Sequence, residues 1–288
     1  MKPVLIFGCG YTGSEVARRL LKEGTKVYAT TRNPAGLREI ETLGATVLRL
    51  DLTETHADNT WIKLAPPKVR VLLSVPTLKA DGNLFDPTPR IVEMLGDVPS
   101  RVVYFSTTGV YGSTREVDEQ TPATPETRRQ HLRVEAEEAV AQGPWPSLIL
   151  RPAAIYGPGR GVHRALSEGR YKLVGRGDNF VSRIHRDDAA RHAIEALSSD
   201  ITGAYPVADE EPCTSRVIAA FCARQMNLPM PESVTSDEVD ETRRADRRVD
   251  GSAIREKLGI ELYFPSYQVG IPASIAAERQ EPCRTQQL

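Results

Sequence analysis

The stretch VLIFGCGYTG, residues 4–13, decides the fold. An apolar run is followed at once by glycines in the spacing G-x-G-x-x-G. The next stretch, SEVARRLLKEG (14–24), has its apolar residues at helical spacing and ends at a glycine. Together they predict a strand, a turn and a helix at the start of the chain.

Glycine has a physical reason at each position of this turn. Gly8 permits a tight turn, Gly10 lets a diphosphate approach the backbone, and Gly13 lets the helix pack closely on the strand. The first amide groups of the helix face the same place. We therefore predict that the turn, with Tyr11 and Thr12, binds the diphosphate of a dinucleotide. A plain strand-to-helix turn is the alternative.

Further apolar runs alternate with helical segments through the first half of the chain. The expected strands are 4–8, 26–30, 46–50, 69–75, 101–106 and 147–151, and the expected helices are 14–24, 33–44 and 127–142. Strands that are apolar on both faces and separated by helices form parallel sheets covered on both sides. The prediction is an α/β protein with a Rossmann-type, doubly wound parallel sheet.

The regular alternation ends after Arg151, and residues 152–183 are rich in Gly and Arg. We predict a dinucleotide-binding domain over 1–151. A smaller, irregular C-terminal substrate lobe is expected over 152–288, with 187–208 returning to the first domain.

Composition narrows the class of function. The formal net charge of −1 argues against a nucleic-acid partner or a membrane surface, and no apolar run reaches the roughly 20 residues that span a bilayer. The cysteines are scattered without the spacing of a metal site or a disulfide framework. They are Cys9, Cys213, Cys222 and Cys283. We expect a cytoplasmic protein that has no metal site and acts on a small molecule.

The end of the second expected strand bears on which dinucleotide binds. A Rossmann strand normally ends here in an acid that holds the adenosine ribose. In this chain it ends ATTRN, and no acid occurs between Glu23 and Glu39. We assign Thr31 and Arg32 to the cofactor, because an arginine can bind a 2′-phosphate through paired hydrogen bonds. NADP is preferred over NAD, and a solvated Arg32 is the alternative.

Two further strand ends are assigned to the cofactor. Asp51 and Leu52, in LDLT, are placed to touch the adenine, although an aspartate also starts turns. Ser74 and Val75 stand at the end of the expected strand 69–75.

These features and later motifs together resemble the extended short-chain dehydrogenase/reductase superfamily, of the NAD-dependent epimerase/dehydratase type. The motifs are GCGYTG (8–13), LDLT (50–53), FSTTGVYG (105–112), RPAAIYGPGR (151–160) and RIHRDDAA (183–190). The resemblance implies a dinucleotide-dependent reaction at a carbonyl or hydroxyl of a small or nucleotide-linked substrate. It also implies that Pro152 lines the nicotinamide and that a homodimer is possible.

In that family a Ser or Thr, a Tyr and a Lys form the catalytic group, and the Lys lowers the pKa of the Tyr. Thr107 takes the Ser/Thr position. The chain has no Tyr between Tyr111 and Tyr156 and no Lys between Lys79 and Lys172. The resemblance is therefore to a branch that lacks the Tyr-x-x-x-Lys pair.

Arginines stand where that pair is expected. Alignment on Glu137 places Arg129 and Arg133 there, and alignment on Glu135 places Thr127 and His131 there. Arginine is a poor proton donor because its pKa exceeds about 12. Arg133 can still replace the lysine as a fixed positive charge, and Tyr111 and Tyr156 are candidates for the missing acid.

The later motifs supply candidate substrate residues. Arg160, in a Gly-rich loop, could hold a phosphate or carboxylate, and Tyr156, Arg183 and His185 are expected on the substrate side. A solvated arginine and a structural histidine are the alternatives.

Two structural expectations concern charged residues. Asp187 or Asp188 is expected to cap the helix that follows. A basic cluster either reaches over the cleft toward an anionic group or is solvated. Its members are Arg243, Arg244, Arg247 and Arg248.

Two functions of different classes follow. In the first, the chain is an enzyme in which Thr107 polarises the reacting oxygen, Arg133 holds the ribose or stabilises negative charge, and a tyrosine such as Tyr111 moves the proton. In the second, the chain is a catalytically inactive dinucleotide-binding sensor or scaffold.

Overall fold

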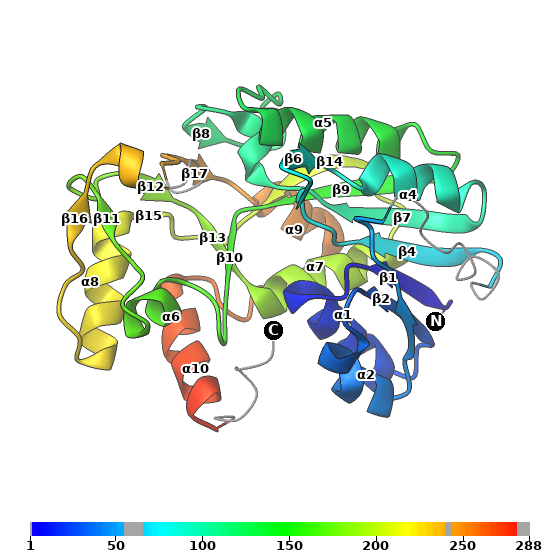
Figure 1. Ribbon diagram of the computed structural model, residues 1–288, viewed down its shortest axis with the longest axis horizontal. Coiled ribbons are helices and arrows are strands. Elements are labelled where there is room, and N and C mark those ends of the chain that lie inside the picture. Colours follow the sequence, from blue (N-terminus) through cyan, green and yellow to red (C-terminus); the bar gives the residue numbers. More distant parts are fainter. Residues whose placement is uncertain (1, 55–65, 240–243, 281–288) are drawn as a thin grey trace.

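The computed structural model describes residues 2–54, 66–239 and 244–280. At its centre is a seven-stranded sheet in the order β14-β9-β7-β4-β1-β2-β3, in which every neighbouring pair is parallel (Figure 1). The strands are β1 (Val4–Phe7), β2 (Val27–Thr31), β3 (Thr46–Arg49), β4 (Val69–Leu73), β7 (Pro99–Phe105), β9 (Ser147–Pro152) and β14 (Gly203–Val207). The predicted doubly wound α/β sheet is confirmed.

Helices cover both faces of the sheet (Figure 1). On one face lie α1 (Tyr11–Lys22), α2 (Arg38–Thr42), α7 (Arg186–Ser198) and α9 (Ser252–Leu258), and on the other lie α4 (Thr88–Leu95) and α5 (Arg128–Ala141). Successive side chains of β1 enter different cores, Val4 and Ile6 on one face and Leu5 and Phe7 on the other. A strand buried on both faces must be apolar throughout, which explains the opening run.

The strand order reverses at β1, which has β2 on one side and β4 on the other. Sheets of this kind bind ligands at the carboxyl ends of the strands, at the point of reversal. There β1 runs into Gly8 and β4 runs into Ser74, whose amide donates to Phe7 O over 2.8 Å. The glycine turn therefore lies at the reversal point.

Two buried arginines of the sheet donate hydrogen bonds to the carbonyls at the carboxyl end of α7. Arg70 of β4 donates to Leu197 O over 3.1 Å, and Arg101 of β7 donates to Ala196 O over 2.6 Å. The last carbonyls of a helix lack intrahelical partners and carry partial negative charge, so cations stabilise them. These contacts explain how arginines fit inside strands that are otherwise apolar.

The remaining described part of the chain consists of short strands and three helices. Its strands are β10 (Ala154–Tyr156), β11 (Leu173–Val174), β12 (Phe180–Val181), β13 (Arg183–His185), β15 (Cys213–Thr214), β16 (Ser233–Val234) and β17 (Arg248–Val249), and its helices are α6 (Val162–Ser167), α8 (Ser215–Met226) and α10 (Tyr267–Gln280). The hairpin β5 (Leu78–Ala80) and β6 (Asn83–Phe85), the strand β8 (Glu116–Val117) and the 3₁₀ turns η1 (Pro34–Leu37), η2 (Thr108–Tyr111) and η3 (Ser236–Glu238) complete the list. None of the described helices is long and apolar enough to cross a membrane.

The cap of α7 differs from the expectation. His185 is the N-cap residue, and its Nδ1 accepts from the amide of Asp187 over 3.2 Å. The carboxylate of Asp188 instead accepts from the amides of Tyr263 and Phe264, over 2.8 and 3.0 Å. The prediction that Asp187 or Asp188 caps the helix is therefore wrong, because Asp188 holds a distant segment.

Candidate functional site

The glycine turn is closely packed at two of its glycines. Gly8 has a φ of +75°, and a Cβ at this position would lie 2.5 Å from Ser74 O. A Cβ at Gly13 would lie 2.7 Å from Gly8 O. Both distances are far below van der Waals contact, so the turn excludes any larger residue at these positions.

The third glycine faces open space. A Cβ built on Gly10 meets no described atom within 4 Å. The helix α1 begins at the next residue, and no described side chain caps its first turn. The turn therefore leaves room for a ligand at Gly10, beside the positive end of the helix, where the first amides of a helix lack intrahelical partners. A diphosphate fits this cradle in charge and in hydrogen-bonding capacity.

The end of β2 combines packing with an exposed cation. Thr30 anchors the glycine turn, since its Oγ1 accepts from the amide of Gly8 over 3.3 Å. Thr31 Oγ1 accepts from the amide of Asn33 over 3.2 Å and so shapes the turn after the strand. Arg32 is exposed. It is also close enough to Asp51 to contribute to lowering the pKa of that carboxyl.

Asp51 itself starts a turn. Its Oδ1 accepts from the amide and the hydroxyl of Thr53, over 2.9 and 2.7 Å, and these bonds are the main reason that its pKa is lowered. Leu52 is buried in the core beneath α4 and α5. The turn-forming alternative thus has direct support, and contact of Asp51 with the adenine remains a prediction.

Arg133 is buried and bound to the protein itself. Its guanidinium donates to Val75 O and to Asp86 Oδ2, both over 2.9 Å, and to Phe105 O. It also lies 4.8 Å from the ring centroid of Tyr104. These contacts join the ends of β4 and β7, so they favour a positioning role over the ribose contact that the sequence analysis assigned.

A buried polar network stands beside the expected catalytic threonine. The Ser106 hydroxyl donates to Glu137, and Arg151 forms an ion pair with Glu137 at 2.6 Å. Arg151 also donates to the Tyr111 hydroxyl over 3.1 Å. Sequence reasoning missed this network, although Glu137 was the residue on which the register was set.

Tyr111 and Thr107 differ in their access to a substrate. Tyr111 is 1% exposed, and burial raises the pKa of its phenol, which favours the neutral form. Thr107 is half-buried at the end of β7, and its Oγ1 accepts from the amide of Gly109 over 3.0 Å. That bond orients the hydroxyl and uses one lone pair, so its proton can be donated to a substrate oxygen.

Tyr156 is buried where β10 packs against α10. Its hydroxyl donates to Ser266 O over 3.3 Å, and its ring is edge-on to His185. A Cβ on Gly270 would overlap its hydroxyl. The position favours packing over contact with substrate, and burial raises the pKa of the phenol above its usual value.

Arg183 and His185 lie in β13, the strand that pairs with β10 beside Tyr156. Arg183 donates to Val181 O over 2.7 Å and to Cys213 Sγ over 3.3 Å. His185 Nε2 is 3.3 Å from Ser274 Oγ, and burial lowers the pKa of the imidazole to about 4. The structural alternative for His185 is therefore better supported than a substrate contact, and the same holds for Arg183.

Among the described members of the basic cluster, Arg247 is buried, whereas Arg244 is exposed, as the solvated alternative expects. Arg247 is 7% exposed and donates to the carbonyls of Thr108, Gly112 and Thr114, which fixes the segment that contains η2. Arg248 pairs with Glu116 at 2.7 Å. Arg244 donates to Val239 O over 3.0 Å, and Arg243 lies outside the described residues.

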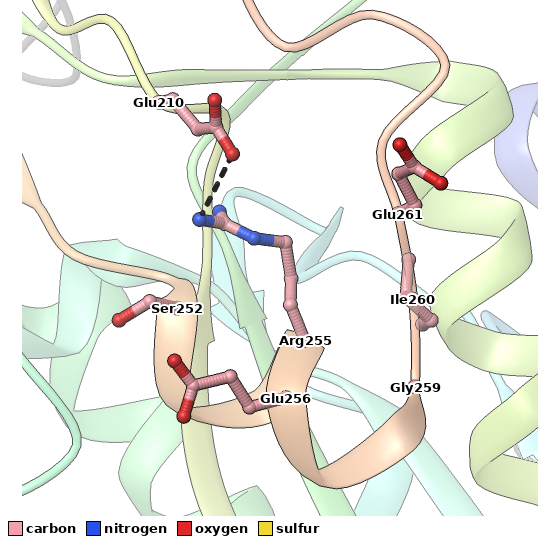
Figure 2. A pocket seen from close by; sticks show the side chains of 7 residues that line it. All are labelled: Glu210, Ser252, Arg255, Glu256, Gly259, Ile260 and Glu261. Carbon is pink, nitrogen blue, oxygen red and sulfur yellow. Dashed lines mark hydrogen bonds and ion pairs between the residues drawn. The ribbon is translucent and has the colours of Figure 1, made fainter.

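A pocket of about 420 Å³ lies beside α9, and no predicted cofactor residue lines it. Arg255 and Glu210 point toward each other within it (Figure 2). Arg255 Nη2 lies 3.4 Å from Glu210 Oε1. A neighbouring pocket of about 550 Å³ shares these two residues and also includes Asp209. Neither Asp209 oxygen has a hydrogen-bond partner among the described residues, and burial raises the pKa of this carboxyl to about 8.

Comparison with known proteins fits this geometry. A model of the NAD dependent epimerase/dehydratase family matches residues 4–208. The chain belongs to this family. Among the described residues, no group of three or more His, Cys, Asp or Glu side chains is arranged to hold a metal ion.

Relatives of this epimerase/dehydratase family member include proteins of known and unknown activity. A functionally unknown conserved protein from Silicibacter pomeroyi is 31% identical, with a TM-score of 0.80 over 96% of this chain and 99% of its own. A UDP-glucuronic acid 4-epimerase variant from Bacillus cereus, in complex with a fluorinated UDP-sugar and NAD, has a TM-score of 0.81 at 18% identity, over 98% and 100% of the two chains. A 3-diazoavenalumate denitrifying reductase from Streptomyces is 32% identical over 106 residues, which is 35% of each chain.

Proposed function

We propose that this protein is an NADP-dependent oxidoreductase or epimerase-like enzyme that acts on a carbonyl or hydroxyl group with non-standard catalytic residues. The observation that carries the proposal is the open glycine turn at the reversal point of the sheet, where Gly10 faces free space and α1 begins without a side-chain cap in the described part. A bound nicotinamide supplies or accepts a hydride.

The end of β2 supports the preference for NADP. The end of β2 carries the exposed cation Arg32 in place of an acid, and a 2′-phosphate is the part of NADP that such a cation would bind. The family as a whole is NAD-dependent, so NAD remains the alternative cofactor.

The chain's own residues give a partial catalytic scheme. The Thr107 hydroxyl would donate a hydrogen bond to the reacting oxygen, held in place by its own bond from the Gly109 amide. Arg133 would fix the ends of β4 and β7, next to which a bound nicotinamide would lie. The neutral Tyr111, which follows this threonine in η2 and is hydrogen-bonded to Arg151, remains the proposed proton donor.

The substrate class is part of the proposal. Solved relatives hold UDP-sugars, and one curated relative is a reductase, so a panel of nucleotide sugars, small aldehydes and ketones covers both cases.

A homodimer is also proposed from the family resemblance, although Arg128, His131 and Glu135 give the outer side of α5 a charged surface. Sedimentation at micromolar concentration would reveal whether the chain is a monomer instead.

One experiment separates the enzyme from an inactive sensor. NADPH and NADH are titrated by fluorescence, and oxidation is then followed at about 340 nm over the substrate panel. We expect binding and turnover with at least one substrate. The Thr107→Val variant should keep cofactor affinity and lose turnover about a hundredfold, because one oxyanion-type donor is worth roughly that much.

The sensor alternative has a specific observation in its favour. The helix α5 carries arginines at 129 and 133 and neither tyrosine nor lysine, and Arg133 is bound internally. Tight binding of NADPH with no oxidation across the panel, and with no epimerised product from the nucleotide sugars, would support the sensor and reject the enzyme. Equal turnover by the wild type and Thr107→Val would reject the role of this threonine.

A further inference from the structure

The loop of residues 157–160 lies directly against the glycine turn. The hydroxyl of Tyr11, the first residue of α1, donates to Pro158 O over 3.0 Å. Gly157 has a φ of +152°, and a Cβ there would lie 2.7 Å from the Tyr11 hydroxyl oxygen. The close approach of the two loops therefore requires glycine at this position.

Two guanidinium groups lie over the ring of Tyr11. Arg160 and Arg186 each have their central carbon 5.3 Å from the ring centroid. Arg186 is engaged by Asp187 at 3.0 Å and by Glu15 at 3.7 Å. Arg160 is exposed and forms no ion pair within the part of the chain that the structure describes. A positive charge without an ion-pair partner in the described residues thus lies over the ring of Tyr11, the residue that follows Gly10.

The backbone under Arg160 is held on both sides. The amides of Gly157 and Arg160 each donate to the other's carbonyl, over 2.9 and 3.0 Å. The amide of Gly159 donates to Glu278 over 2.7 Å, and the same carboxylate oxygen is 2.9 Å from His163 Nε2. The loop is fixed to α10, and the Tyr11 ring supports the guanidinium, so little side-chain freedom is left to lose on binding.

We propose that Arg160 binds the diphosphate of the dinucleotide, from the side opposite the amides of the glycine turn. This assignment rests on the proposed cofactor binding and refines it, since the sequence alone suggested a substrate phosphate or carboxylate for this residue. A guanidinium binds phosphate oxygens through two parallel hydrogen bonds, and the turn supplies the other donors. The cofactor site then has two walls, one from the sheet and one from the loop that precedes α6.

The test uses ADP-ribose, which carries the diphosphate without the nicotinamide, and adenosine, which carries no phosphate. Their affinities for the wild type and for Arg160→Gln are measured by calorimetry. We expect Arg160→Gln to weaken ADP-ribose and NADPH about tenfold or more, because a charge-assisted bond is lost. Adenosine should change less than about twofold. Arg160→Lys should be intermediate, since it keeps the charge and loses the paired geometry.

Arg164→Gln is the matched control, because Arg164 is nearby in α6 but pairs with Glu168 at 2.6 Å. It should bind ADP-ribose like the wild type. Unchanged affinity of Arg160→Gln for ADP-ribose would overturn the assignment while leaving the proposed function intact. A wild-type protein that binds neither ADP-ribose nor NADPH would overturn the proposed function and this assignment together. Since Arg160 is exposed, an unchanged thermal transition should accompany the variant.

Discussion

At the scale of single residues, sequence reasoning worked best where backbone geometry selects one residue type. Gly8 and Gly13 could be predicted because any side chain there would collide with the backbone. Arg133 and Tyr156 could not be placed, because a sequence does not reveal whether a polar group finds its partners inside the protein. Val75 O and Ser266 O are such partners, contributed by distant parts of the chain.

Arg32 offers a residue-scale test of cofactor choice. Replacement by Asp should weaken NADPH about tenfold or more and NADH much less, because only NADPH carries the 2′-phosphate that this side chain would bind. Arg38→Asp makes the same charge change on exposed residue 38, at the start of α2, and serves as the control. Dissociation constants from fluorescence titration decide the matter. An equal loss for both cofactors, or no loss, would contradict the preference for NADP.

At the scale of elements, helices with clear start signals were found and one without them was missed. The expected helix 127–142 is α5 (Arg128–Ala141), which begins with a capping box formed by Thr127 and Gln130. The expected helix 33–44 is instead η1 followed by the short α2. The helix α10 was not expected at all, because it contains Pro272 and Gly270 and lacks a clear apolar stripe.

The carboxyl end of α7 gives an element-scale prediction. Arg101→Met should lower the free energy of unfolding by about 2 kcal/mol, since the carbonyls of Ala196 and Ile201 lose a charged donor in a buried place. Denaturant unfolding measures the loss. Arg115→Met, at a side chain 72% exposed and paired with Asp246, is the control and should change stability by less than about 0.5 kcal/mol. Similar losses in both variants would show that the contacts of Arg101 with α7 contribute no more to the free energy of unfolding than an exposed ion pair does.

At the scale of the whole molecule, the sequence predicted the large sheet but not how the segments of the C-terminal part contact one another. Apolar runs separated by helices specify a covered parallel sheet almost uniquely. The C-terminal part is held together by hydrogen bonds between segments that are distant in the sequence, such as those of Asp188 with Tyr263 and of His185 with Ser274. Such long-range contacts leave no periodic pattern in the sequence, so only the folded structure reveals them.

Buried titratable groups predict how the stability of the whole protein depends on pH. His185 and His192 have folded pKa values lowered to about 4, so the unfolded chain binds more protons between about 4 and 6.5, and stability rises with pH there. Asp209 has a folded pKa raised to about 8, so the folded chain binds more protons between its ordinary value of 3.8 and about 8, and stability falls across that range. Since two histidines oppose one aspartate, these groups together give maximal stability near pH 6.5.

Asp209→Asn tests this balance. The variant should be more stable than the wild type at pH 8.5, by an amount on the order of 3 kcal/mol, and the difference should shrink toward pH 5. Urea unfolding at several pH values provides the measurement. Asp178→Asn, at a side chain 70% exposed, is the control and should show no such trend. A gain that is the same at pH 5 and pH 8.5 would rule out ionisation of Asp209 as its cause.

The internal contacts of Arg133 restrict how this scaffold can be re-engineered. A designer who grafts a tyrosine and a lysine onto positions 129 and 133 would also remove the fork that joins Val75, Phe105 and Asp86. An ammonium is a single point charge and cannot span three acceptors in that planar arrangement. Strand ends that have lost these hydrogen bonds would position the introduced tyrosine and lysine poorly. A successful graft must therefore also supply new hydrogen-bond donors for the three acceptors.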